Sequence, residues 1–508
     1  MITNLPERGV SFPRSTVRYG WLPITLILCA AAFIFTYRLG YEGLWIDEFF
    51  SIRDATTFQN DFFEAYQNTR LRPLYYMVLA VWMHFGSSDV WLRLPAVGAS
   101  LASVFLIYKL GLRVADKTTG LIAAALLTLS PLFVNHTQEI RMYTLSLCLG
   151  LAGSLFAAEI LLTEKDQTPS KKSFAQWVVF RVLAIYTVPL NLTLLVADSF
   201  LMLLRFRRDR ATLISCAKWM GLIFLCWSPT VITALGAVAP SSEYSQSREQ
   251  YLARPGLGNL IYPLKYWMVP PFVTHTGKAA HIFYKLFTLL IAGIIGAGLL
   301  HKRKSPSLAW AAAWYVIPLI PIVAVSTQAA QLWELRYVLF VSPYLFLLIA
   351  AGFTRLLKDW KPAAILLGAI YFIGMSNALI HYYDVQNRAD YEANLATIEQ
   401  AEQPGDTVIW GHEWHPTLEA DALERYYRGD ANFYFSQSAG VESREAIREW
   451  IDQFPKGATR TWVVIGYLAP MGDKFETIVS ETYNIEQTFT DYKGASAIFL
   501  LTPKETAS

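Results

Sequence analysis

Apolar runs of about 18–25 residues recur along this chain, and each is long enough to cross a lipid bilayer. The 508 residues are 54% hydrophobic and only 16% charged, with a mean hydropathy of +0.31. This composition is too apolar for a soluble protein of this size, and the sequence predicts a polytopic α-helical membrane protein. The net charge of +3 is spread along the chain, and no basic tract indicates a nucleic-acid partner.

We expect about eleven membrane-spanning helices. They lie near residues 20–38, 92–113, 118–135, 142–163, 174–189, 191–206, 212–236, 281–300, 307–326, 337–357 and 362–381. A further apolar run, residues 73–86, is too short to span and is typical of a re-entrant or interfacial helix.

The distribution of Lys and Arg supports the interpretation that residues 73–86 do not cross the membrane. If residues 73–86 do not cross, all the basic clusters fall on the same side of the membrane. The positive-inside rule identifies this side as cytoplasmic. The clusters are Arg8/Arg14/Arg18, Lys109/Arg113/Lys117, Lys165/Lys171/Lys172, Arg205/Arg207/Arg208/Arg210, Lys302/Arg303/Lys304 and Arg355/Lys358/Lys361. The N-terminus is then cytoplasmic, residues 39–91 form one large outer loop, and the C-terminus is outside.

After about residue 382 the composition becomes that of an ordinary soluble domain. We therefore divide the chain into a transmembrane part, residues 1–381, and a soluble extracytoplasmic α/β domain, residues 382–508. The expected elements are helices at 389–402, 417–427 and 442–453, and strands at Thr407–Trp410, Trp462–Tyr467 and Ala497–Leu501. No glycine-rich phosphate loop opens either of the domain's later helices, so no nucleotide site is assigned.

Cysteine usage indicates neither disulfides nor a zinc site. The four cysteines (Cys29, Cys148, Cys216 and Cys226) all lie inside apolar segments, where a free cysteine usually acts as a small hydrophobic residue. No Cys/His spacing typical of a structural zinc site is present. We expect no resident metal or cofactor, although a divalent cation beside the acidic residues of the outer loop stays an alternative.

An acidic pair, Asp47–Glu48, lies in the outer loop between aromatic residues. Carboxylates are costly to desolvate at a membrane surface, so such a pair indicates either a functional site or a solvated loop or N-cap acid. A carboxylate in apolar surroundings has a raised pKa and is a usable general base. Asp47 is the candidate base, and Glu48 would orient it, bind a cation or face water.

Several arginines are expected in the same outer layer. Arg72 precedes Pro73, and Arg93 lies at the outer end of the second expected span. Arginine beside aromatics at an interface is often only an anchor, but guanidinium also binds phosphate in a bidentate manner. Both interpretations stay open for these two residues.

A dense polar segment follows the third expected span. It contains His136, Glu139 and Arg141, of which the last two could pair with each other or serve a site. Further along, Arg336 lies beside Tyr337 at a helix start, as a lipid-phosphate contact or an interfacial anchor.

The order and spacing of these motifs resemble the GT-C superfamily of membrane glycosyltransferases, in particular the bacterial protein O-mannosyltransferase and aminoarabinose-transferase-like group. The resemblance covers most of the chain. It rests on Trp45-Ile46-Asp47-Glu48, Pro73-Leu74-Tyr75-Tyr76, Arg93-Leu94-Pro95, the stretch from Ser130-Pro131 to Arg141-Met142-Tyr143, Arg336-Tyr337 and the C-terminal α/β domain. One departure is Leu71-Arg72-Pro73-Leu74-Tyr75, where many relatives have a His-Pro-Pro-Leu-Tyr-like segment.

The resemblance implies an inverting transfer of a hexosyl or pentosyl group from a polyprenyl-phosphate donor to an acceptor hydroxyl on a glycan, lipid or protein. Asp47 would be the catalytic base, with Glu48 assisting. The substrate-binding candidates are Arg72, Tyr76, Arg93, Glu139, Arg141, Arg336 and Tyr337. The expected location is the bacterial plasma (inner) membrane.

Two other classes of function compete with the enzyme. A transporter or flippase of lipid-linked sugars would share the phosphate-binding arginines and the many spans, but the sequence shows no inverted repeat. A structural or assembly protein would leave the acidic pair unexplained.

Overall fold

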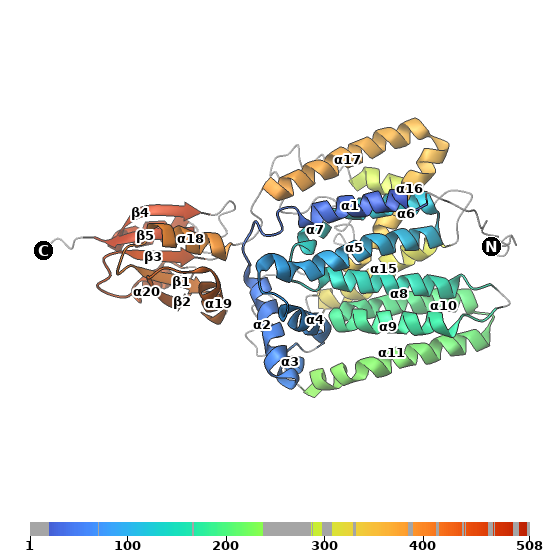
Figure 1. The fold of residues 1–508 in the computed structure, drawn as a ribbon, viewed down its shortest axis with the longest axis horizontal. Helices are drawn as coiled ribbons and strands as arrows, with labels where there is room; N and C mark the ends of the chain where they lie inside the picture. The colour runs from blue at the N-terminus through green and yellow to red at the C-terminus, as the bar shows by residue number, and fades with distance from the viewer. Residues whose placement is uncertain are drawn as a thin grey trace.

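The structure is a computed structural model with a helical bundle and, beyond one end of it, a domain built on a β-sheet (Figure 1). It describes residues 20–69, 71–164, 167–236, 286, 288–296, 307–328, 332–384, 390–412, 416–438, 441, 443–465, 471, 473–490 and 497–504.

The helices of the bundle agree in place with most of the expected spans. They are α1 (Leu22–Thr36), α2 (Ile46–Asn60), α3 (Phe62–Asn68), α4 (Pro73–Met83), α5 (Asp89–Val114), α6 (Lys117–Thr128), α7 (Pro131–Thr137), α8 (Tyr143–Leu161), α9 (Lys171–Thr187), α10 (Leu192–Phe206), α11 (Arg210–Gly236), α15 (Leu308–Gln328), α16 (Ser342–Asp359) and α17 (Lys361–Asp384). Short 3-10 turns at Pro189–Asn191 and Leu339–Val341 precede α10 and α16. Half of the expected span 281–300 lies outside the described residues, and residues 286 and 288–296 of it are described.

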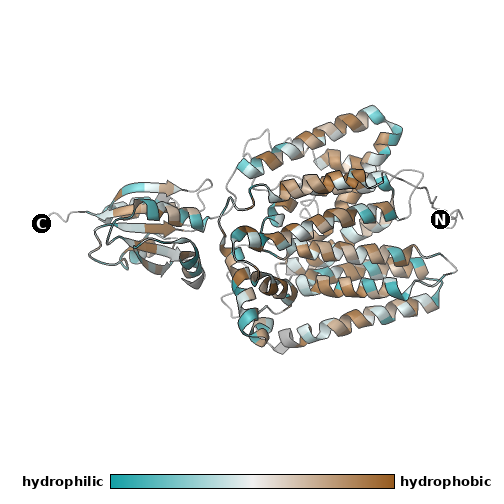
Figure 2. Ribbon diagram, viewed as in Figure 1, coloured by the Kyte–Doolittle hydropathy of each residue, from teal (hydrophilic) through white to brown (hydrophobic). Residues whose placement is uncertain are grey.

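Among the described residues, 7 helices are long and apolar enough to cross a membrane, or 8 if a bent pair counts as one span. Large apolar side chains are exposed on α1, α10, α11 and α17, including Phe33, Leu203, Leu225 and Ile373. Apolar residues run along the long helices of the bundle, whereas hydrophilic residues gather on α2 and on the sheet domain (Figure 2). Exposed apolar surface of this extent fits contact with lipid, and the chain is a multi-pass membrane protein.

The expected span 118–135 corresponds to two helices that together are long and apolar enough for a span. The structure divides it into α6 and α7, which are bent by 64°. Pro131 opens α7, and Ser130 caps it by accepting a hydrogen bond from the amide of Phe133 at 3.4 Å. Because proline lacks an N–H and restricts the residue before it, α6 ends before this point. The following polar segment, residues 138–142, contacts α2, where the amide of Ile140 donates to Glu48 at 2.9 Å.

Two other elements are shorter than a bilayer is thick. The 11 residues of α4 correspond to about 16 Å of helix and those of α1 to about 22 Å, against a hydrocarbon core of about 30 Å. The short α4 is what residues 73–86 predict. It lies with α2 and α3 at the end of the bundle that faces the sheet domain (Figure 1).

The C-terminal domain is a five-stranded sheet with helices. Its elements are α18 (Tyr391–Ala401), β1 (Thr407–His412), α19 (Pro416–Tyr426), β2 (Asn432–Gln437), α20 (Arg444–Ile451), β3 (Thr461–Ile465), α21 (Asp473–Thr482), β4 (Tyr483–Thr490) and β5 (Ala497–Pro503). The strand order is β2-β1-β3-β5-β4, with β1 parallel to β2 and β3, and β5 antiparallel to β3 and β4. Apolar clusters cover both faces of the central strands. We retain residues 1–381 and 382–508 as the proposed division of the chain.

Candidate active site

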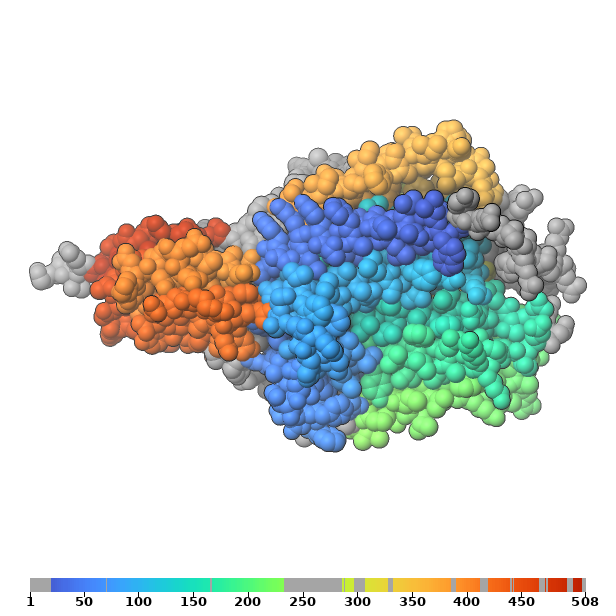
Figure 3. Space-filling view, in the orientation of Figure 1, coloured from blue at the N-terminus to red at the C-terminus, as the bar shows by residue number. Residues whose placement is uncertain are grey.

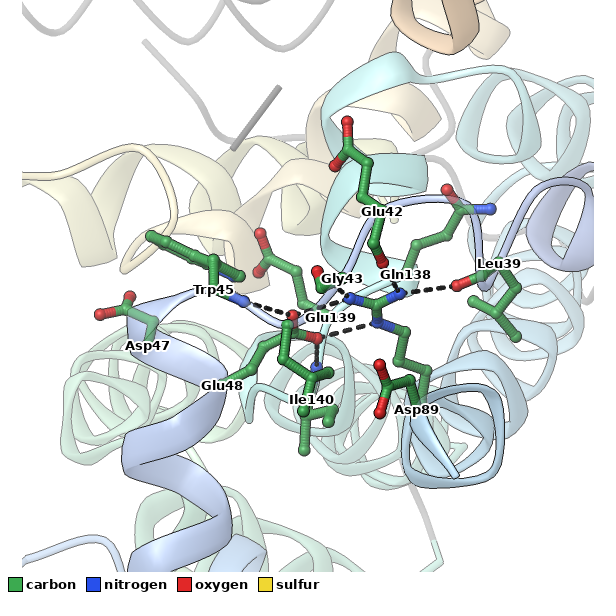
Figure 4. Close-up of polar contacts among 12 residues, drawn as sticks. Leu39, Glu42, Gly43, Trp45, Asp47, Glu48, Asp89, Gln138, Glu139 and Ile140 are labelled. Carbon is green, nitrogen blue, oxygen red and sulfur yellow. Dashed lines mark hydrogen bonds and ion pairs between the residues drawn. The ribbon is translucent and has the colours of Figure 1, made fainter. Parts of the chain in front are cut away.

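The first turn of α2 carries both acids of the Asp47–Glu48 pair. Negative side chains are favourable there because the N-terminus of a helix carries partial positive charge. Consecutive helical residues point about 100° apart, so Asp47 and Glu48 face different surroundings. The Glu48 side chain is fully buried, whereas that of Asp47 is 20% exposed. In Figure 4 the Asp47 carboxylate points away from that of Glu48.

Glu48 forms a bidentate ion pair with Arg93 of α5 (Figure 4). The Arg93 Nε donates to Oε1 at 3.0 Å and Nη2 donates to Oε2 at 2.8 Å. Glu48 Oε1 also accepts a hydrogen bond from the amide of Ile140 at 2.9 Å. One carboxylate therefore joins α2, α5 and the polar segment that follows α7.

The remaining N–H groups of Arg93 all donate to the chain that leads into α2. Their acceptors are the carbonyl oxygens of Leu39 (2.8 Å), Glu42 (2.9 Å) and Gly43 (3.1 Å). A guanidinium has five N–H donors, and Arg93 uses every one of them inside the protein. This arrangement differs from the sequence expectation of a phosphate contact at Arg93 and of an assisting acid at Glu48, because it leaves Arg93 no donor for a ligand.

Asp47 lies between two arginines from distant parts of the chain. Its Oδ2 is 2.8 Å from Nη1 of Arg336 and 3.6 Å from Nη2 of Arg141. Arg141 also donates to the carbonyl oxygen of Asp47 at 2.8 Å and to the hydroxyl of Ser51 at 3.2 Å. Burial by itself would lower the pKa of Arg141, but the Asp47 carboxylate raises it well above its ordinary value, so Arg141 stays charged. Two guanidinium groups flank the Asp47 carboxylate, and Arg336 also pairs with Glu334, so two positive charges face two negative ones.

Aromatic rings hold the two guanidinium groups. Arg141 lies 5.7 Å from the ring centroid of Tyr143, and Arg336 lies 5.5 Å from that of Tyr337. The two rings are 6.2 Å apart, so the aromatic pair links both arginines. Arg336 is also paired with Glu334 at 2.6 Å, and its side chain is 27% exposed.

Glu139 serves a local network. It accepts from Nδ2 of Asn135 at 3.2 Å and lies 2.9 Å from Nδ1 of His136, whose ring contacts Tyr143 at 5.1 Å. Glu139 is thus connected to the arginine cluster through His136 and Tyr143.

Arg72 and Tyr76 lie on the α4 side of the site. Arg72 precedes the first turn of α4 and lies 6.0 Å from the ring of Tyr76. A carboxylate that sequence reasoning missed, Asp54 of α2, faces this region. Burial raises the pKa of Asp54 above its ordinary value, against the charges of Arg72 and Arg141.

A helical period would have revealed this second acid. Asp47, Ser51 and Asp54 are spaced i, i+4 and i+7, which places them on one face of α2. The predicted site residues thus fall into an Asp47 cluster with Arg141, Arg336 and their tyrosines, and a separate Glu48–Arg93 pair. Within the described residues, no group of three or more His, Cys, Asp or Glu side chains is arranged to hold a metal ion.

Comparison of the sequence with family models gives no match, and no curated protein is similar to it. Comparison of the structure with solved structures does give matches. ArnT from Cupriavidus metallidurans bound to undecaprenyl phosphate is 13% identical, and the match covers 95% of this chain and 98% of ArnT with a TM-score of 0.56.

Two further solved structures are similar. AglB, the oligosaccharyltransferase of Archaeoglobus fulgidus, in complex with an inhibitory peptide and a dolichol-phosphate, is 12% identical over 96% of this chain and 77% of AglB, with a TM-score of 0.54. The arabinofuranosyltransferase AftD from Mycobacteria is 13% identical over 96% of this chain and 42% of AftD, with a TM-score of 0.51. All are GT-C fold glycosyltransferases, and the chain shares that fold.

Proposed function

We propose that this protein is a glycosyltransferase that moves a sugar from a polyprenyl-phosphate donor to an acceptor hydroxyl at the outer face of the membrane. The observation that carries the proposal is the Asp47 carboxylate, partly exposed on the first turn of α2 and flanked by Arg336 and Arg141. The GT-C fold supports it, and so do the undecaprenyl phosphate of ArnT and the dolichol-phosphate of AglB, which are lipid phosphates bound to proteins of that fold.

The proposed reaction is a single displacement with inversion. The acceptor oxygen attacks the anomeric carbon while the bond from that carbon to the phosphate oxygen breaks. The bonding electrons leave with the lipid phosphate, and Asp47 takes the proton of the acceptor hydroxyl. Arg336 and Arg141 stabilise the negative charge that develops on the phosphate.

Arg336 is partly exposed and pairs with Asp47 at 2.8 Å, so in this proposal the donor phosphate binds beside the base. Glu48 and Arg93 take a positioning role in this proposal, and Arg72, Tyr76, Glu139 and Tyr337 line its surroundings.

The remaining parts of the proposal concern location and cofactors. We place the site on the extracytoplasmic side of the bacterial inner membrane, with the N-terminus in the cytoplasm. We propose no resident cofactor, with a divalent cation beside Asp47 as the alternative. Activity that survives chelation by EDTA and full metal removal favours a site without a cofactor. Activity that is lost on chelation and restored by added metal favours a divalent cation.

The test is transfer by the purified full-length protein from a synthetic polyprenyl-phosphate sugar. We expect Asp47→Asn to lower kcat by about 10² to 10⁴-fold while binding of undecaprenyl phosphate persists. Glu64→Gln is the matched control, since Glu64 is an exposed carboxylate of the same outer loop. Undiminished turnover by Asp47→Asn would overturn the base assignment. Sugar movement across a vesicle membrane without any transfer would favour the flippase instead.

A further inference from the structure

The C-terminal domain reaches α2 on the side opposite to the Asp47 cluster. Phe49 lies about 200° around the helix from Asp47, and Arg53 lies one turn beyond it. Phe49 makes edge-to-face contacts with Tyr391 (5.8 Å) and Tyr426 (6.3 Å) of the C-terminal domain. Arg53 forms an ion pair with Asp421 at 2.8 Å. The helix that carries the proposed base is therefore held between the bundle and the sheet domain, and the two meet in Figure 3.

Tyr426, the last residue of α19, ties this contact to the chain just before α2. Its hydroxyl accepts a hydrogen bond from the amide of Leu44 at 2.9 Å and donates to Oδ2 of Asp89 at 2.5 Å. Arg425 pairs with the other oxygen of Asp89 and donates to the carbonyl oxygen of Ser87 at 2.5 Å. One tyrosine hydroxyl thus joins the entry of α2, the start of α5 and the C-terminal domain.

The chain at Gly43 allows this approach. A Cβ at Gly43 would lie 2.6 Å from Oδ1 of Asp390 and 2.7 Å from Cβ of Glu392, both at the start of α18. Gly43 also gives its carbonyl oxygen to Arg93. Gly43 is consequently held between Arg93 of the bundle and the start of α18, and the next residue, Leu44, is bonded to Tyr426.

We propose that Tyr426 is a positioning residue and that the C-terminal domain sets the direction of Asp47 by holding α2 from outside. This inference rests on the proposed function for its kinetic consequence only. Loss of the Tyr426 hydroxyl leaves the Leu44 amide and the Asp89 carboxylate without a shared partner. The first turn of α2 then moves relative to Arg336 and Arg141, which changes the geometry of the base without removing a ligand contact.

The chain supplies a matched control in the next residue. The hydroxyl of Tyr427 also accepts from a backbone amide, that of Ala431 at 2.8 Å, and also bonds a carboxylate, that of Glu402. All of its partners belong to the C-terminal domain. Tyr426→Phe and Tyr427→Phe therefore remove the same two kinds of hydrogen bond. Only the bonds of Tyr426 join the C-terminal domain to residues of the outer loop, Leu44 and Asp89.

The experiment compares the two full-length variants in two ways. Hydrogen–deuterium exchange of peptides covering residues 43–60 is expected to speed up in Tyr426→Phe and to stay as in wild type in Tyr427→Phe. In the transfer reaction, Tyr426→Phe is expected to lower kcat by about tenfold to a hundredfold with the Kd for undecaprenyl phosphate unchanged. Equal exchange and equal kcat in both variants would overturn the inference.

A second pair of variants covers the case in which Tyr426→Phe fails to fold. Arg53→Asp is expected to speed exchange in α2, and Arg53→Asp with Asp421→Arg to restore it. No change in either variant would count against the inference. If the wild-type protein binds no lipid phosphate and transfers no sugar, the proposed function fails, while the exchange measurements still decide whether the C-terminal domain holds α2.

Discussion

Asp47 and Glu48 are neighbours in the sequence but have different surroundings in the fold. Glu48 is fully buried, and its carboxylate accepts from Arg93, from the amide of Ile140 and, at 3.4 Å, from the amide of Trp45. Asp47 keeps part of its surface exposed and has a partner, Arg336, that is itself partly exposed. A buried carboxylate with saturated partners holds structure in place, whereas an accessible one can exchange partners with a ligand.

The Glu48–Arg93 pair yields a prediction about stability. Arg93→Leu should lower the free energy of unfolding in detergent by about 3–5 kcal/mol, because it leaves Glu48 charged and buried without its partner. Arg113→Leu is the contrast, since the Arg113–Glu159 pair at 3.1 Å is more exposed and should cost less than about 1 kcal/mol. Similar losses of unfolding free energy in both variants would show that the burial of an ion pair does not set its contribution to stability.

Asp54 yields a prediction about pH. Its pKa is raised in the folded protein by burial, so the fold binds this proton more tightly than the unfolded chain does. Protonated Asp54 therefore contributes stability that is fully present below the ordinary pKa of aspartate. This contribution is lost as the pH rises through the raised pKa of Asp54 in the folded protein. Asp54→Asn should therefore raise the thermal unfolding temperature more at pH 8 than at pH 4. A uniform shift at both pH values would contradict the assigned direction.

At the level of the elements, close helix contacts depend on glycine. A Cβ at Gly120 of α6 would lie 2.6 Å from the carbonyl oxygen of Tyr108, and one at Gly111 of α5 would lie 2.5 Å from the Cα of Gly120. Small residues of this kind let two helix backbones approach inside a membrane protein. Outside this contact, the Ser130 cap and the proline ring of Pro131 decide where the same helix α6 ends.

The α5–α6 contact can be tested by adding one methyl group. Gly120→Ala should lower the free energy of unfolding by about 1–3 kcal/mol, because the obstacle is backbone and cannot rotate away. Gly98→Ala on α5 is the control, since a Cβ there meets nothing within 4 Å. Unfolding measured in the same detergent should find Gly98→Ala equal to wild type or more stable, and a loss like that of Gly120→Ala would be unexpected.

Across the whole molecule, a second buried ion pair joins the consecutive helices α9 and α10 and reaches the distant α15 through Trp314. Arg181 of α9 binds both oxygens of Asp198 of α10, at 2.8 and 3.0 Å, and also the hydroxyl of Ser154 of α8. Asp198 additionally accepts from the indole N–H groups of Trp177 and of Trp314 on α15. Ionisable residues in a membrane often mark a transport path. Here each charge is enclosed by protein partners, which favours a structural role.

This network predicts a strongly non-additive pair of substitutions. Asp198→Leu alone should cost several kcal/mol, on the order of 3–5, because Arg181 is left charged in the bundle. Arg181→Met combined with Asp198→Leu should recover much of that loss. Unfolding by SDS in mixed micelles measures both, and a double variant no better than the single one would show that the hydrogen bonds matter more than the charge.

The sequence predicted the elements of the sheet domain unevenly. Helices α18, α19 and α20 and strands β1, β3 and β5 fall close to their expected positions, since strong apolar patterns mark them. The expectation omitted β2, β4 and α21. Strands β2 and β4 are the edges of the sheet, and most of their residues are at least partly exposed, so their apolar pattern is weak.

The sequence by itself determined that the chain is a multi-pass membrane protein and that a polar domain follows the bundle. These properties depend on local composition and on the length of apolar runs, which any segment carries without its neighbours. Only the tertiary structure decided that Arg93 binds Glu48 and that Arg336, 289 residues away, binds Asp47. Such pairs depend on how whole helices pack, because packing sets which of several arginines reaches which acid.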